Sequence, residues 1–255
     1  MKTVKVKNLT IGEGIPKICV PIVGVTKEEI LEEARTVAGL PADLVEWRVD
    51  WFEDALVEDK VVAVLQELRE ALGEIPILFT FRTKNEGGEK SIAQERYVSL
   101  LMCAAKSKLV DLIDVEVFFG DFIRQLIVDV HNTGTKVVGS NHDFAKTPPK
   151  EEIINRLKAM QEMGADIPKL AVMPQCEEDV EILTGATKEM VERYADRPIV
   201  TMSMGELGKP SRIEGELFGS AITFGSAKKA SAPGQIEVIA LRKHLEEIHK
   251  KRVEK

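Results

Sequence analysis

The chain has 255 residues, of which 44% are hydrophobic and 30% are charged, as is usual for a folded protein with a full core. Its formal net charge of −7 argues against a nucleic-acid partner, because such a partner needs a concentrated basic face. No apolar stretch approaches the roughly 20 residues that span a bilayer and no signal-peptide pattern opens the chain, so we expect no membrane partner and a cytoplasmic location.

Strand-like and helix-like segments alternate along the chain with little between them. Residues 4–11 alternate on either side of a turn-prone asparagine and predict a short hairpin. Eight later segments have the length and the flanking residues of strands: 17–22, 44–50, 76–82, 112–118, 136–141, 168–173, 198–203 and 220–224. The segments between them carry apolar residues at helical spacing, as at 61–72, 153–160 and 236–248.

Strands separated by single crossover helices run parallel, and eight such units in about 250 residues predict a (β/α)8 TIM barrel of the α/β class. We expect the hairpin to close the bottom of this barrel. One domain over residues 1–255 is predicted, because no repeat, low-complexity segment or proline-rich linker marks a boundary. A doubly wound open sheet is the alternative, but no G-x-G-x-x-G motif follows the first strand.

Lys169 stands out because it lies inside an apolar run of strand length, residues 167–173. A lysine in such a strand is expected to be buried. Burial disfavours the ammonium form, so it would lower the pKa of the lysine and make the free amine available as a nucleophile toward a carbonyl. The alternative for a single strand lysine is that its ammonium reaches a carboxylate at the strand end.

Charged residues at alternate strand positions indicate that this lysine is not alone. Glu46, Arg48 and Asp50 share one face of their predicted strand. In a parallel barrel one strand face meets the helices and the other fills the interior, so these charges are expected in the lumen or at its C-terminal mouth. The same placement is predicted for charged residues of the next strands: Arg82, Asp114 and Glu116.

His142 is the histidine that we expect near a strand C-terminus, and an imine-forming lysine needs a proton shuttle. Glu86, in the loop after the third strand, could orient the imidazole. The pair Gly87-Gly88 that follows is a weak phosphate-binding signal, and we interpret it as part of a mobile loop. Residues 228–235 are small, basic and predicted to form a lid, although Ser231 or the region of Gly234 could equally do no more than cap the last helix.

Taken together, these residues resemble the type I 3-dehydroquinate dehydratases. The resemblance runs in order over nearly the whole chain, and the motifs that carry it lie at residues 46–50, 81–83, 86–89, 140–144, 169–174, 202–205, 211–212 and 231–235. Two positions depart from the family pattern. Pro21 stands where some relatives carry a serine near the substrate, and Lys209-Pro210 precede the Ser-Arg pair in a variable loop.

The resemblance implies a homodimeric barrel without metal or cofactor that converts 3-dehydroquinate to 3-dehydroshikimate, the third step of the shikimate pathway to chorismate. Water would leave by syn elimination through a lysine imine. The implied catalytic residues are Lys169 as imine former, His142 as acid and base, and Glu86 as partner of the histidine. The implied substrate-binding residues are Arg212 on the carboxylate and, around the rest of the pocket, Glu46, Arg48, Arg82, Ser231 and Gln235.

The cysteines also favour a metal-free site, because they are scattered, odd in number and expected to be reduced thiols: Cys19, Cys103 and Cys176. Two other functions stay open at this point. A class I aldolase also uses a strand lysine in a barrel, but it often needs a phosphate site near strands seven and eight, for which Gly225-Ser226 is weak support. A barrel that only binds a carboxylate ligand would explain the arginines and leave the lysine and histidine unused.

Overall fold

The structure is a computed structural model that describes residues 3–227 and 231–254. Its strands are β1 (Val4–Val6), β2 (Leu9–Ile11), β3 (Lys17–Ile22), β4 (Leu44–Arg48), β5 (Ile77–Thr80), β6 (Leu112–Glu116), β7 (Lys136–Asp143), β8 (Ile167–Val172), β9 (Val200–Ser203), β10 (Ile222–Ser226) and β11 (Ile236–Glu237). Its helices are α1 (Lys27–Ala38), α2 (Glu58–Leu72), α3 (Gln94–Ser107), α4 (Ile123–Asn132), α5 (Lys150–Glu162), α6 (Glu177–Arg193), α7 (Lys209–Ile213), α8 (Gly215–Phe218) and α9 (Val238–Val253), with short 3₁₀ turns η1 (Val49–Trp51) and η2 (Lys84–Glu86).

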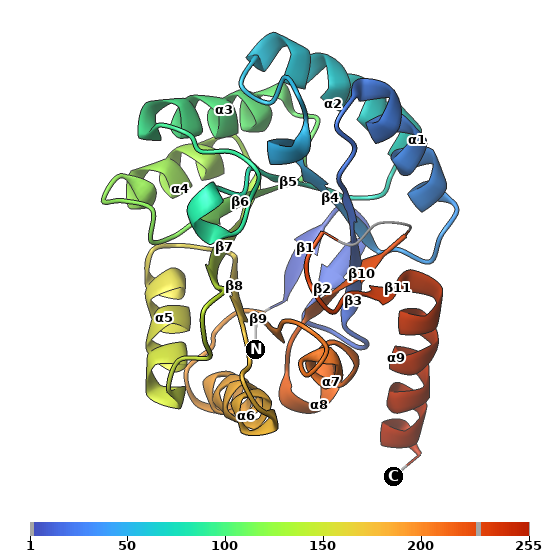
Figure 1. Cartoon of the computed structure of the whole chain (residues 1–255), viewed down its shortest axis with the longest axis vertical. Helices are drawn as coiled ribbons and strands as arrows, with labels where there is room; N and C mark the ends of the chain where they lie inside the picture. The colour runs from blue at the N-terminus through green and yellow to red at the C-terminus, as the bar shows by residue number, and fades with distance from the viewer. Residues whose placement is uncertain (1–2, 228–230, 255) are drawn as a thin grey trace.

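The strands β3 to β10 form the wall of a parallel barrel. Consecutive strands from β3 to β9 pair with one another, and β10 returns to pair with β3. The ring closes between β9 and β10, where Ile199 bridges to Ser220 and the Ala221 N–H donates to the Ile199 carbonyl at 2.9 Å. Figure 1 shows the strands at the centre and the helices around them. The predicted (β/α)8 barrel is therefore confirmed.

The hairpin β1–β2 closes one end of the barrel, as predicted. Its strands pair antiparallel, and in Figure 1 its faded colour places it behind the barrel strands. Val4, Val6 and Ile11 are buried in one cluster with inward side chains near the start of the barrel strands: Leu44, Leu78, Leu112, Val138 and Ile167. This apolar plug leaves the opposite end, where the strands terminate, for polar side chains.

The two faces of each strand have different partners. On β8, Leu170 and Val172 pack with the outer helices, whereas Ile167 and Ala171 join the interior cluster. Lys169 lies between these last two positions in the strand alternation, so it must face the lumen. Burial of a leucine or valine side chain contributes about 1.5–3 kcal/mol, which makes a register shift that would turn the lysine outward very unfavourable.

Several predicted boundaries were wrong by a few residues. β4 ends at Arg48, so Asp50 lies in the turn η1 instead of the strand, and β7 continues to Asp143, so His142 lies within the strand instead of after it. The last helix begins at Val238, and Ile236 belongs to the short strand β11. The N-cap of that helix is Glu237, whose side chain accepts from two backbone N–H groups, so the alternative that Ser231 or the region of Gly234 caps it was wrong.

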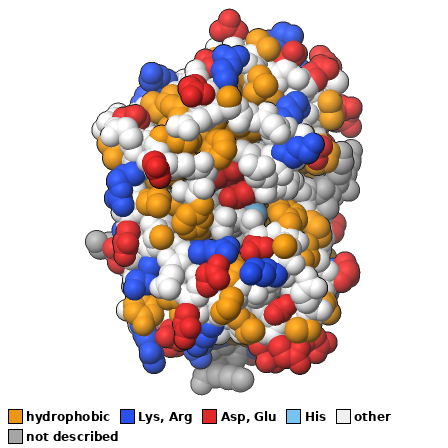
Figure 2. All heavy atoms as spheres, turned by 60° about the vertical axis from the view of Figure 1, so that its left-hand side comes forward, with side chains coloured by type: hydrophobic (Ala, Val, Ile, Leu, Met, Phe, Trp, Pro, Cys, Tyr) orange, Lys and Arg blue, Asp and Glu red, His pale blue; other side chains and the backbone are white. Residues whose placement is uncertain are grey.

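The surface shows no concentrated basic face on the side drawn in Figure 2, in agreement with the net charge of −7. On the face drawn in Figure 2, Lys and Arg side chains are interspersed with Asp and Glu and with hydrophobic groups. Within residues 3–227 and 231–254, no helix combines the length and the apolar character that a membrane crossing requires. The three cysteines are free thiols.

Candidate active site

A pocket of about 470 Å³ lies at the carboxyl ends of the barrel strands. It collects every residue that the sequence predicted for the site: Glu46, Arg48, Arg82, Glu86, His142, Lys169, Arg212, Ser231 and Gln235. Apolar side chains complete its wall, among them Ala171, Met202, Met204 and Phe224. These residues come from six strands or strand ends and from the loops that follow, so the barrel alone brings them together.

Lys169 lies on β8 with only 4% of its surface exposed, so its predicted burial is confirmed. Its Nζ lies 3.6 Å from Glu46 Oε1 and 3.6 Å from Asp114 Oδ2, and 4.4 Å from the centre of the Phe224 ring. The sequence argument offered burial and pairing with a carboxylate as alternatives, and the structure combines them, because the buried nitrogen has two carboxylate neighbours. The nitrogen is thus held at the floor of the pocket by charge as well as by packing.

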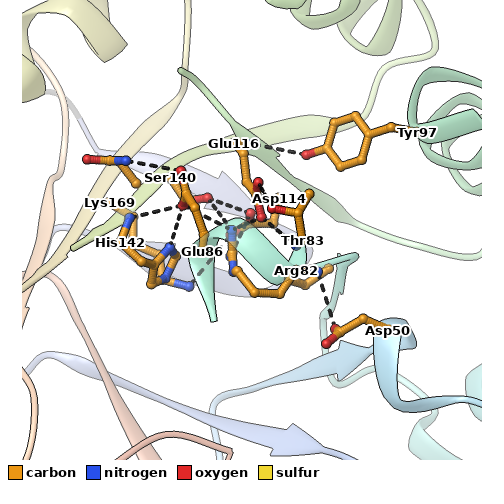
Figure 3. A network of polar contacts seen from close by, with 12 residues as sticks. Asp50, Arg82, Thr83, Glu86, Tyr97, Asp114, Glu116, Ser140, His142 and Lys169 are labelled. Atoms are coloured by element: carbon orange, nitrogen blue, oxygen red, sulfur yellow. Dashed lines mark hydrogen bonds and ion pairs between the residues drawn. The ribbon is translucent and has the colours of Figure 1, made fainter. Parts of the chain in front are cut away.

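Glu86 and His142 form a close pair beside this lysine (Figure 3). The distance from His142 Nδ1 to Glu86 Oε2 is 2.9 Å, and the His142 backbone N–H donates to the same oxygen at 3.0 Å. Asn141 Nδ2 donates to Glu86 Oε1 at 3.0 Å. The glutamate side chain is only 12% exposed, so it is fixed in place and leaves Nε2 of the imidazole as the nitrogen free to face a ligand.

Burial shifts both members of this pair toward their neutral forms. It raises the pKa of the Glu86 carboxyl to about 8, although Arg82 opposes the shift. Burial also lowers the pKa of His142 well below its usual value, and the nearby cations Arg82 and Lys169 lower it further. His142 is therefore a neutral imidazole near pH 7, the form that can accept a proton.

The glycine pair after Glu86 has a packing reason. Gly87 has a φ of +82°, and a Cβ there would come within 2.3 Å of the Phe144 ring, which stacks on His142. A Cβ on Gly88 would come within 1.9 Å of the Arg82 carbonyl oxygen. Any larger residue would force the Phe144 ring or the backbone at Arg82 to move, and this close packing accounts for the pair without a phosphate.

Arg82 connects the pocket to a buried layer of acidic side chains beneath it (Figure 3). Its Nη2 donates to Asp114 Oδ1 at 2.8 Å, and its Nη1 donates to Glu116 Oε1 at 2.9 Å and to Ser140 Oγ at 3.0 Å. The guanidinium lines the pocket, but protein groups already occupy both of its terminal nitrogens. Sequence reasoning placed the two carboxylates in the lumen from their alternate positions and did not assign them to the site.

Arg48 is also paired with an acid. Its Nε and Nη2 donate to the two carboxylate oxygens of Asp50 at 2.8 Å each. Asp50 is fully buried and also accepts from the backbone N–H of Arg82 and of Glu89. The turn η1 thus brings Asp50 back to brace Arg48, which corrects the prediction that these two residues lie side by side along one strand.

Arg212, on α7, differs from the other two arginines. It is 1% exposed, and its Nη2 donates to the Pro233 carbonyl at 3.0 Å. Within the described part of the chain no carboxylate pairs with it, and its Nε has no hydrogen-bond partner. Burial lowers the pKa of Arg212 to about 10, so the group is still a cation near pH 7. A buried cation without an acid partner is a site for an anion.

Ser231 and Gln235 close the remaining side of the pocket. The Ser231 backbone N–H donates to Gln235 Oε1 at 2.9 Å, and Gln235 Nε2 donates to Ser231 Oγ at 3.0 Å. The rest of the predicted lid, at Lys228 and Lys229, lies outside the described residues. In the residues that are described, no group of three His, Cys, Asp or Glu side chains is arranged to hold a metal ion.

Comparison with known proteins gives the same family from sequence and from structure. Residues 18–252 match the family model described as Type I 3-dehydroquinase. The chain is 55% identical over 249 residues to the 3-dehydroquinate dehydratase of Clostridium botulinum strain Eklund 17B, an alignment that covers 97% of this chain and 98% of that protein.

Two solved structures extend the likeness to three dimensions. A type I 3-dehydroquinate dehydratase from Clostridium difficile, crystallised with covalently modified comenic acid, is 53% identical, with a TM-score of 0.96 and coverage of 98% and 99% of the two chains. The 3-dehydroquinate dehydratase of Enterococcus faecalis is 47% identical, with a TM-score of 0.89 and coverage of 96% and 98%. The chain therefore belongs to the type I 3-dehydroquinase family, the enzymes that dehydrate 3-dehydroquinate in the shikimate pathway.

Proposed function

We propose that this enzyme removes water from 3-dehydroquinate through an imine on Lys169. The Nζ lone pair attacks the substrate ketone, and the carbinolamine loses water to give a protonated imine. The observation that carries the proposal is the buried amine of Lys169 in one pocket with the Glu86–His142 pair. The covalently modified ligand in the C. difficile relative supports covalent chemistry in this family.

The imine makes the adjacent carbon acidic enough for a histidine. The protonated imine accepts the electron pair of the broken C–H bond and becomes an enamine, while neutral His142 takes the proton. The resulting imidazolium then donates to the departing hydroxyl on the same side of the ring, so that water leaves and the imine is restored. Hydrolysis of that imine releases 3-dehydroshikimate and the free lysine. Glu86 holds the imidazole in place through Nδ1 during the two proton transfers.

Reductive trapping tests the imine directly. Sodium borohydride added with 3-dehydroquinate should reduce the imine, inactivate the enzyme and leave a stable adduct on Lys169, located by peptide mass mapping. Borohydride alone, and borohydride with substrate after exhaustive chelation, are the two controls, and only the second should inactivate. An adduct on Lys228 or Lys229 with Lys169 unmodified would overturn the assignment.

Arg212 is proposed to bind the substrate carboxylate, because it is the buried cation that lacks an acid partner in the described structure. Arg212→Gln should lower kcat/KM on the order of a hundredfold, mainly through KM, since losing a buried charge partner costs about 2–5 kcal/mol. Arg212→Lys should recover part of this loss because it keeps the charge and loses the two parallel donors. Steady-state kinetics would contradict the role if the glutamine variant kept its KM.

The remaining substrate contacts are proposed for Glu46, Arg48, Arg82, Ser231 and Gln235, which line the same pocket. Since both terminal nitrogens of Arg82 are bound to protein groups, its contribution to the substrate is mainly electrostatic. A homodimer, a single domain over residues 1–255, and the absence of a cofactor stay predictions. Light scattering of the purified protein tests the first of them.

A further inference from the structure

Asp114 lies behind the pocket on β6 and is fully buried. Its Oδ1 accepts hydrogen bonds from Arg82 Nη2 at 2.8 Å and from Ser140 Oγ at 2.6 Å. Its Oδ2 has no hydrogen-bond partner among the described residues and lies 3.6 Å from Nζ of Lys169. One oxygen of this carboxylate is therefore fixed by two donors, and the other faces the amine (Figure 3).

We propose that Asp114 is a positioning residue for the Lys169 nitrogen, whose positive charge it balances before the attack on the ketone and again in the protonated imine. This inference rests on the proposed imine and adds a group that acts on the nitrogen instead of on the substrate. A buried acceptor without a hydrogen bond is unfavourable, which gives Oδ2 a strong preference for a charged nitrogen at that position.

Glu46 lies at the same distance from the amine, but its surroundings differ from those of Asp114. Its Oε1 already accepts from Thr80 Oγ1 at 2.9 Å, and its side chain lines the pocket that the substrate fills. Asp114 is not part of the pocket wall, so it stays beside the nitrogen when substrate is bound. Burial opposes ionisation of Asp114, but the neighbouring Arg82 and Lys169 outweigh it and lower its pKa, so the group is a carboxylate near neutral pH.

A substitution can isolate the charge of Asp114 from the other charged groups near the amine. The titratable and charged groups around the amine and this carboxylate are, with Asp114 itself on β6, Cys19 on β3, Glu46 on β4, Arg82 just after β5, Glu86 in η2, Tyr97 on α3 and His142 on β7. Asp114→Asn removes one negative charge from this set and keeps the size of the side chain. An Asn oxygen can still accept from Arg82 and Ser140.

Asp114→Asn should change two measurements in opposite directions. Borohydride trapping with 3-dehydroquinate should extend to lower pH, because an amine without its anion loses its proton more readily. At the same time kcat should fall by about tenfold or more, because the protonated imine loses the balancing charge, while KM changes less. A general loss of structure would weaken trapping and turnover together, so the opposite signs identify a role at the nitrogen.

Glu116→Gln is the matched control. Glu116 is 1% exposed and binds the same guanidinium, through Arg82 Nη1 at 2.9 Å, but it makes no ion pair with Lys169. The pH range of trapping should stay that of the unmodified enzyme in this variant. Equal shifts in the two variants would mean that Asp114 acts through Arg82, and would overturn the inference. Wild-type kcat and pH range in Asp114→Asn would overturn it as well.

Ser140→Ala is a second variant that tests the role of Asp114 if Asp114→Asn does not fold. It removes one of the two donors that fix Oδ1, so both effects should appear with the same signs and smaller size. No change in either measurement would count against the inference. The unmodified enzyme is trapped first: no adduct on Lys169 there would overturn the imine itself, whereas an adduct there with no change in the variants overturns only the role of Asp114.

Discussion

Replacing Lys169 by alanine is expected to abolish turnover of 3-dehydroquinate and to leave the barrel folded. Without the amine there is no imine, and the proton next to the ketone is too weakly acidic for a histidine near neutral pH. We expect a loss of several orders of magnitude in kcat, measured by the absorbance of the enone product. Borohydride and substrate should leave this variant without any adduct.

The fold is expected to survive because the neighbours of the lysine keep other partners. Removing one member of a buried ion pair costs about 3–5 kcal/mol when the other charge is left alone. Here Asp114 still pairs with Arg82, and Glu46 still accepts from Thr80, so the loss should be smaller. Circular dichroism and thermal unfolding should show a cooperative transition at a lower Tm. Lys169→Met, which keeps the volume of the stem, separates the lost charge from the cavity.

Lys209→Ala is the control for lysine loss near the pocket. Lys209 lies in α7, three residues before Arg212, but its side chain is 42% exposed and pairs with Glu206 on the surface. This variant should turn over at nearly the normal rate. Comparable activity in the Lys169 and Lys209 variants would show that the buried amine is not the nucleophile.

Replacing His142 by alanine is expected to stop the reaction after the covalent step. The amine of Lys169 remains, so the imine should form, but both proton transfers pass through the imidazole. One acid–base group is commonly worth about 10²–10⁴-fold, and a residue that serves two transfers should cost at least the upper part of that range in kcat. Intact-protein mass spectrometry should show a persistent adduct with 3-dehydroquinate without any borohydride.

Comparing Glu86→Gln with His142→Ala shows which of the two residues transfers the proton and which one only holds the other in place. The amide can still bond to Nδ1 of His142, so the imidazole stays oriented while the ionisable carboxyl group is lost. We expect a smaller fall in kcat than for His142→Ala and no accumulation of adduct. If His142→Ala turned over near the normal rate, or Glu86→Gln were the more damaging change, the glutamate would be the proton shuttle.

The barrel could be predicted because each strand carries its own periodic signal. Alternation within residues 167–173 placed Lys169 on a strand, and the charges at Glu46 and Arg48 could only face a lumen once the strands were parallel. The boundaries were less certain, because the chain turns at Asp50 through a hydrogen-bond pattern that involves residues far along the sequence, including Arg82 and Glu89.

The pairing of charges inside the barrel could not be predicted in the same way. The contact of Asp114 with both Arg82 and Lys169 depends on the relative register of β5, β6 and β8, which no local pattern contains. The burial of Glu86 was missed for a related reason. It depends on Gly87 fitting beneath the ring of Phe144, a contact between loops after different strands.

The hairpin that fills the lower end of the barrel affects how substrate enters the pocket and how product leaves it. With Val4, Val6 and Ile11 packed against the first residues of the barrel strands, the described residues close that end of the barrel, and the pocket opens at the other end, where the strands terminate. Substrate, product and the released water must share that opening, so a new substrate molecule enters only after the previous product has left. A compound bound at the opening would therefore block substrate entry and product release together.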